Sequence, residues 1–164
     1  AMQFVHAYSR PWLNVVMLAI TQTGGVLTAL VFIALLYWLY WLGEFRWMWA
    51  AAVSFLGPIS VNALLKLWFA RPRPDVFTPL IAVHTFSFPS GHTAAAVSLY
   101  GFLAFVLWRA DKKPLAVLSL LWVFLVALSR VYLGVHYPSD VLGALTFGGA
   151  WLLGVMGWFF MRGS

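Results

Sequence analysis

The chain alternates long apolar stretches with short polar connections. A helix that crosses a bilayer needs roughly 20 mostly apolar residues. On this criterion we predict transmembrane helices over residues 25–42, 47–69, 91–108, 115–133 and 141–161. The pattern therefore predicts an all-α integral membrane protein built as a bundle of five visible transmembrane helices.

A shorter apolar segment, residues 11–21, precedes these helices and is too short to span a bilayer. The polar and glycine residues 21–25 separate it from the first predicted span. Such a segment is typical of a short helix that lies at the membrane interface or is partly inserted. We expect a single membrane-embedded domain over residues 1–164, with an interfacial segment at 1–24 and the helix bundle at 25–161.

The composition agrees with a location in the bilayer. Apolar residues make up 63% of the chain and charged residues only 9%, whereas a soluble domain carries about 25% charged residues. The absence of cysteine excludes disulfides, thiolate metal sites and a catalytic thiol. The basic residues behind the net charge of +6 lie at helix ends and in one cluster. We therefore expect the phospholipid bilayer and a phosphorylated lipid as partners, and no nucleic acid.

The connections fall on two sides of the membrane because consecutive spans alternate in direction. Residues 70–90 and 134–140 share one side, and residues 43–46 and 109–114 share the other. The basic residues on the second side are Arg46, Arg109, Lys112, Lys113 and Arg162. The positive-inside rule makes that side cytoplasmic. We thus expect a multi-pass protein of the cytoplasmic membrane whose first side faces away from the cytoplasm.

Polar residues concentrate in three segments that the helix count brings to the extracytoplasmic side. They are Lys66 and Arg73 at the end of the second span, Ser90, Gly91 and His92 at the start of the third, Arg130 and His136 at the end of the fourth, and Asp140 at the start of the fifth. Ionisable groups at membrane depth are costly and usually functional. We therefore predict one active site that is built from all three segments.

Three fixed positive charges in this predicted site, on Lys66, Arg73 and Arg130, repel one another unless they hold an anion. Arginine makes paired hydrogen bonds to phosphate oxygens. Ser90 and Gly91 lie at a helix start, where free backbone N–H groups favour an anion, and Gly91 lets the backbone approach closely. We predict that these five residues bind a phosphate group.

The two histidines of the cluster suit phosphate transfer. Asp140 follows His136 by four residues in the first turn of the last helix, so its carboxylate can bond one ring nitrogen and leave the other free to attack. We predict that His136 is the nucleophile and forms a phospho-histidine. His92 then acts as the general acid for the leaving oxygen and as the base that activates the hydrolytic water.

These segments resemble the motifs of the type 2 phosphatidic acid phosphatase superfamily, which includes membrane lipid phosphatases and soluble vanadium haloperoxidases. The patterns are Lys-x6-Arg-Pro from Lys66, Pro-Ser-Gly-His to His92 and Ser-Arg-x5-His-x3-Asp to Asp140. The resemblance to the membrane branch implies the roles given above, an all-helical bundle, and a reaction without metal ion or cofactor. Because its members usually have six spans, it also implies a further helix before Pro11.

We therefore expect a lipid phosphatase that hydrolyses a phosphomonoester or pyrophosphate of a membrane lipid. Candidate substrates are phosphatidylglycerophosphate, phosphatidic acid and undecaprenyl pyrophosphate. The alternatives are a lipid phosphotransferase with the same histidine nucleophile, a vanadate-dependent peroxidase, and an ion or proton transporter. The spanning helices disfavour the peroxidase. A transporter predicts polar residues along a path across the bilayer, whereas these gather at one side.

Four features near the motifs have less specific interpretations. Arg71 could contact the substrate or only lipid headgroups. Asn62, one helical turn before Lys66, could support the site, but we expect it to make a helix–helix hydrogen bond. We expect His84 to be an ordinary loop residue. The glycine pair at residues 24–25 is expected to permit close contact between helices.

Overall fold

The computed structural model describes residues 9–75, 79–81 and 83–161, and within them the regular structure is entirely helical. The α-helices are α2 (Pro11–Gln22), α3 (Val26–Trp41), α4 (Phe45–Phe69), α5 (Gly91–Ala96), α6 (Phe102–Arg109), α7 (Lys113–Tyr132) and α8 (Pro138–Met156). Two π-helical segments are η1 (Val97–Gly101) and η2 (Gly157–Met161). Segment η1 joins α5 to α6, and η2 extends α8, so each forms part of a longer continuous helix.

Five helical stretches in the described residues are long and apolar enough to cross a membrane. Four of them are Phe45–Phe69, Gly91–Arg109, Lys113–Tyr132 and Pro138–Phe160, and each agrees with a predicted span to within about three residues at either end. Prolines help to define two of the starts, since α7 and α8 each carry proline in the first turn, where its missing N–H costs no hydrogen bond. The predicted all-α bundle is confirmed.

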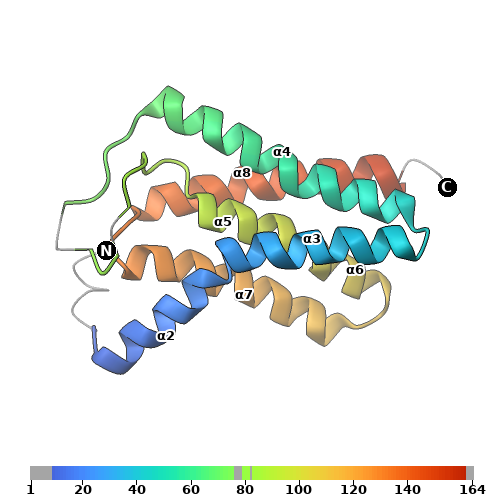
Figure 1. Ribbon diagram of the computed structural model, residues 1–164, viewed down its shortest axis with the longest axis horizontal. Helices are drawn as coiled ribbons and strands as arrows, with labels where there is room; N and C mark the ends of the chain where they lie inside the picture. The colour runs from blue at the N-terminus through green and yellow to red at the C-terminus, as the bar shows by residue number, and fades with distance from the viewer. Residues whose placement is uncertain (1–8, 76–78, 82, 162–164) are drawn as a thin grey trace.

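The first span begins earlier than predicted. Helices α2 and α3 form one apolar stretch of 31 residues, Pro11–Trp41, which is broken by a turn at residues 23–25. The break falls where the polar and glycine residues predicted an interruption. Helix α2 runs at an angle to α3 (Figure 1) and packs on the C-terminal part of α7, where Leu13 and Met17 contact the buried cluster of Tyr132, Leu133 and Val135. Its position at the membrane interface stays a prediction.

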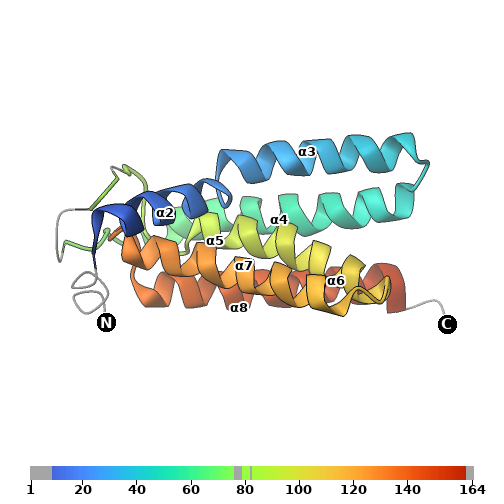
Figure 2. The same cartoon turned by 90° about the horizontal axis from the view of Figure 1, so that it is seen from below.

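Helix α5 lies at the centre of the bundle, where it contacts α4, α7 and α8. Its sequence explains this place, because it ends in three alanines and carries no bulky aliphatic side chain. Ala94 and Ala96 are fully buried, and small residues let membrane helices approach closely. Figure 2 shows α3 on the outside of the bundle, alongside α4.

The outer faces of the helices are apolar and exposed. Leu64 of α4 is 66% exposed and Leu153 of α8 is 73% exposed. Exposed apolar surface of this extent marks an interaction surface, here with lipid tails. The chain is therefore a multi-pass membrane protein, in agreement with its composition.

The connections lie at two ends of the bundle, as the alternation of spans predicts. The described parts of residues 70–90 and the connection from α7 to α8 lie at one end, which we call the site end (Figure 1). The connections from α3 to α4 and from α6 to α7 lie at the opposite end. Of the predicted basic residues there, Arg162 falls outside the described residues.

Gly57 determines how closely α4 and α8 pack. A Cβ atom at this position would overlap the ring of Trp151, whose Nε1 donates to the carbonyl of Val53 at 3.0 Å. We expect Gly57→Ala to lower the free energy of unfolding by about 1–3 kcal/mol. Gly149→Ala is the control, because a Cβ there meets nothing within 4 Å. It should be neutral or stabilising by up to about 1 kcal/mol. Melting temperatures in detergent test this, and equal values for the two variants would contradict it.

Candidate active site

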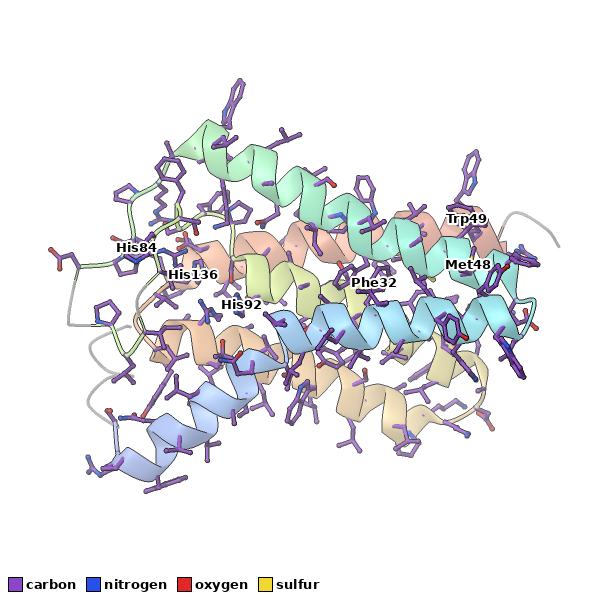
Figure 3. The ribbon with its side chains drawn as sticks, viewed as in Figure 1. Phe32, Met48, Trp49, His84, His92 and His136 are labelled. Carbon is purple, nitrogen blue, oxygen red and sulfur yellow. The ribbon has the colours of Figure 1, made fainter. Side chains whose placement is uncertain are left out.

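The three motif segments meet at the site end. Figure 3 shows His92 and His136 there, with His84 towards the edge, whereas Met48 and Trp49 lie towards the opposite end. Nη1 of Arg73 lies 3.4 Å from Nε2 of His136. His92 is close enough to interact electrostatically with Lys66, Arg73, Arg130 and His136. The structure thus brings together residues that are up to 74 positions apart, from 66 to 140, while their roles stay predictions.

The segment that leads into α5 is held on two sides. Asn62 of α4 donates from Nδ2 to the carbonyl of Pro89 at 3.4 Å, and the N–H of Ser90 donates to the carbonyl of Asp140 at 3.1 Å. The expected helix–helix bond of Asn62 is replaced by this bond to the loop. A Cβ at Gly91 would meet only Oδ1 of Asn62, at 3.5 Å. The protein itself therefore leaves room for a side chain there, and the close approach of a phosphate to Gly91 stays a prediction.

Lys66 and Arg73 are held by backbone carbonyls. Nζ of Lys66 donates to the carbonyl of Phe86 at 2.5 Å. Arg73 donates from Nε to the carbonyl of Thr85 at 2.7 Å and from Nη1 to that of Val135 at 2.6 Å. Within the described residues, neither cation pairs with a carboxylate. The carbonyls fix the positions of these charges and leave them unneutralised.

Arg130 is the most deeply buried cation of the cluster, with 1% of its surface exposed. Its Nη1 donates to Oγ1 of Thr21 at 2.6 Å, but its Nε has no hydrogen-bond partner among the described residues. No carboxylate in the described ranges pairs with it either. A buried charge without an opposite charge beside it is costly, so this position suits a bound anion. The motifs do not reveal Thr21, and its one sequence signal is a hydroxyl at the end of an apolar segment.

His136 and Asp140 lie together at the start of α8 and are 2% and 0% exposed. Nδ1 of His136 is 3.4 Å from Oδ2 of Asp140, although the contact lacks hydrogen-bond geometry. The same Oδ2 accepts a hydrogen bond from the N–H of Tyr137 at 2.9 Å. Burial lowers the pKa of His136 to about 4, even though Asp140 acts to raise it. The ring is therefore neutral at pH 7, as a nucleophile requires.

Arg71 belongs to no predicted part of the site, yet it reaches its centre. Its Nη1 forms an ion pair with Oδ1 of Asp140 at 2.7 Å. The two residues are separated by 69 positions in the sequence. The sequence allows Arg71 to contact the substrate or only lipid headgroups. The structure shows that it contacts a motif carboxylate.

His92 packs against the turn between α2 and α3. A Cβ at Gly25 would lie 3.0 Å from Nε2 of His92, and one at Gly24 would lie 3.1 Å from its carbonyl oxygen. The predicted close contact at this glycine pair is therefore confirmed. The hydroxyl of Tyr100 and the indole of Trp122 both donate to Thr23, at 2.9 Å each. The turn thus forms a wall of the site. His92 can pack so closely against it because glycine has no side chain.

The composition of the cluster indicates what it can bind. Within the described residues, no group of three or more His, Cys, Asp or Glu side chains could hold a metal ion. The cluster instead combines one carboxylate with several cations and two histidines. His84 is exposed and takes no part in it. Such an arrangement favours an anionic ligand with several oxygens.

Comparisons with known proteins give a consistent result. A sequence profile described as the PAP2 superfamily matches residues 46–164. Phosphatidylglycerophosphatase B of Bacillus subtilis (strain 168) is 36% identical over 151 residues, which cover 85% of this chain and 71% of that protein. Undecaprenyl-diphosphatase BcrC of the same organism is 34% identical over 143 residues, or 81% of this chain and 68% of that protein.

Solved structures show the same similarity. The crystal structure of a transmembrane PAP2 type phosphatidylglycerolphosphate phosphatase from Bacillus subtilis superposes with a TM-score of 0.86 at 32% identity, and covers 96% of this chain and 81% of that one. The structure of Aquifex aeolicus LpxE superposes with a TM-score of 0.78 at 25% identity, and covers 94% of this chain and 92% of that one.

Proposed function

This chain belongs to the PAP2 superfamily, whose relatives described above are membrane phosphatases, and on that basis we propose that it hydrolyses a membrane-lipid phosphate through a phospho-histidine. The observation that carries the proposal is the buried Arg130, whose Nε has no partner among the described residues. It lies in a cluster with the unneutralised cations Lys66 and Arg73. Phosphate oxygens would satisfy all three, because guanidinium and ammonium groups bind them by charge-assisted hydrogen bonds.

In the first step, a ring nitrogen of His136 attacks phosphorus and the bond from phosphorus to the leaving oxygen breaks. We assign the attack to Nε2, because Nδ1 faces Asp140 at 3.4 Å. His92, which the negative charge of the bound phosphate keeps protonated, donates its proton to the leaving oxygen and becomes neutral. The developing negative charge on the phosphoryl oxygens is stabilised by Arg73 and Arg130.

In the second step, water attacks the phosphorus of the phospho-histidine and His92 accepts its proton. The bond from phosphorus to His136 breaks, which releases inorganic phosphate and restores the neutral ring. Ser90 and Gly91 lie at the start of the helical span Gly91–Arg109. Their backbone would contact the phosphoryl oxygens there.

The proposed substrates follow from the surroundings of the site and from the relatives. The exposed apolar helix faces suit lipid tails, and the two relatives are named for phosphatidylglycerophosphate and undecaprenyl diphosphate. We place phosphatidylglycerophosphate first, with undecaprenyl pyrophosphate and phosphatidic acid as the other candidates. The basic end with Arg46 and Arg109 would be cytoplasmic, so the site of this single domain would face the other side of the cell membrane.

Phosphate release by purified protein in detergent micelles tests the proposal. The panel contains the three lipids and a soluble phosphate ester, each with and without EDTA. We expect release from at least one lipid, with a rate that EDTA changes by less than about twofold, because the fixed cations take the place of a metal in binding phosphate. A requirement for Mg²⁺ would contradict the mechanism. Transfer of the phosphate to an added alcohol, with no free phosphate, would favour the phosphotransferase.

A further inference from the structure

Arg71 connects the first motif to the third. Besides its ion pair with Asp140 at 2.7 Å, its Nη1 donates to Oγ of Ser139 at 2.8 Å. Its guanidinium carbon lies 4.1 Å from the centre of the Tyr137 ring. All three partners lie within the four residues that follow His136. The backbone of Arg71 is also held, because its carbonyl accepts the N–H of Ser87 at 2.9 Å. Arg71 thus clamps the start of α8 from a loop that is itself anchored.

The two oxygens of Asp140 have different partners. Oδ1 pairs with Arg71, whereas Oδ2 accepts the N–H of Tyr137 and faces Nδ1 of His136. A carboxylate can rotate about its last side-chain bond, so a strong bond to one oxygen fixes the direction of the other. The side chain of Asp140 is 0% exposed, and a buried carboxylate requires a compensating positive charge. A neutral His136 does not supply that charge, and Arg71 does.

We propose that Arg71 is a positioning residue, which holds the Asp140 carboxylate so that Oδ2 faces the ring of His136. The inference rests on the proposed function, in which His136 is the nucleophile. When the ring gains positive charge on phosphorylation, Asp140 already has the correct orientation and does not need to reorganise. Arg71 acts through Asp140 and does not contact the reacting phosphorus.

The kinetic test measures kcat and KM for the best lipid substrate in detergent micelles. We expect Arg71→Gln to lower kcat about tenfold or more, as the loss of a group that orients a functional ligand does, with KM changed less than about twofold. Arg71→Lys should recover part of the loss, because an ammonium can pair with Oδ1 but lacks the planar guanidinium that lies over the Tyr137 ring. Arg10→Gln is the matched control. Arg10 is exposed, its side chain donates to the carbonyl of Ser9, and its loss should leave kcat unchanged.

A double-mutant cycle decides whether Arg71 acts through Asp140. In the Asp140→Asn background, Arg71→Gln should cause no further loss of kcat, because the group that it positions is already changed. An equal loss in both backgrounds would overturn the proposal. So would a raised KM with an unchanged kcat, which would mean that Arg71 binds the substrate. If Arg71→Gln does not fold, the same cycle with Arg71→Lys gives the answer.

A measurement without turnover separates this inference from the proposed function. The pKa of His136 can be followed by NMR of its ring nitrogens, assigned with His136→Gln. The charged or titratable groups around the ring are Asp140, Arg71, Arg73, Arg130, Lys66 and His92. Arg71→Gln removes one positive charge from this set and frees Asp140 for the ring, so the pKa of His136 should rise. An unchanged pKa would overturn the proposed role of Arg71. The proposed function would be overturned by a different result, namely that phosphate release does not depend on His136.

Discussion

His136→Ala should abolish lipid phosphate release, with a loss of at least about 10³-fold in kcat, because no other side chain can replace an enzyme's covalent nucleophile. The variant should still fold. His136 contacts Arg73 and Asp140 at 3.4 Å each, and both residues keep other hydrogen-bond partners when its ring is removed. The measurement is phosphate release, with the wild-type protein run in parallel.

His84→Ala is the matched control for this variant. His84 lies at the same end of the bundle, but it is exposed and belongs to no motif. It should retain the wild-type rate within about twofold, since exposed substitutions rarely disturb a site. Substantial activity in His136→Ala, measured on protein whose melting temperature is unchanged, would remove His136 as the nucleophile.

Arg130→Met should lower activity without lowering stability. It removes the buried donor that we propose binds the phosphoryl oxygens, so kcat/KM should fall about 10²–10³-fold, and inhibition by vanadate should weaken to a similar degree. The melting temperature should not fall, because the variant also removes a buried charge that no described carboxylate neutralises.

The control for Arg130→Met is Arg109→Met at the opposite end of the bundle. Arg109 is exposed, and its loss should change neither kcat/KM nor the inhibition by vanadate. Vanadate serves as the probe because it resembles the phosphoryl group in the transition state. Unchanged vanadate inhibition in Arg130→Met would show that Arg130 does not bind the phosphoryl group.

The sequence predicted the parts of this molecule that have a local signal. The lengths of the apolar stretches predicted the spans. The alternation of their directions predicted that Lys66, His92 and His136 lie at one end of the bundle. The comparisons confirm the superfamily and the kind of enzyme. The roles of the individual site residues stay predictions, because similarity of fold and of sequence does not measure what a side chain does.

The contacts that the sequence did not predict join distant residues without a periodic or motif signal. Arg71 lies two residues before Arg73. The sequence around it does not indicate whether its side chain contacts the substrate or Asp140. Thr21 reaches Arg130 across 109 positions, because α2 packs beside α7. Asn62 bonds to a loop carbonyl, because the loop into α5 passes beside α4. Each depends on how helices and loops pack, which short patterns do not encode.

Thr21 and the turn at residues 23–25, which contact Arg130 and His92, precede residue 46 in the chain. The match to the superfamily profile begins only at residue 46. Part of the environment of His92 and Arg130 is thus built by a segment that holds no motif residue. A hybrid protein that takes residues 9–45 from a relative would keep all the predicted catalytic groups. It would nevertheless change what presses on His92 and what anchors Arg130. Changes confined to this segment would therefore alter the surroundings of His92 and Arg130 without altering any motif, and a comparison of motifs alone would not detect them.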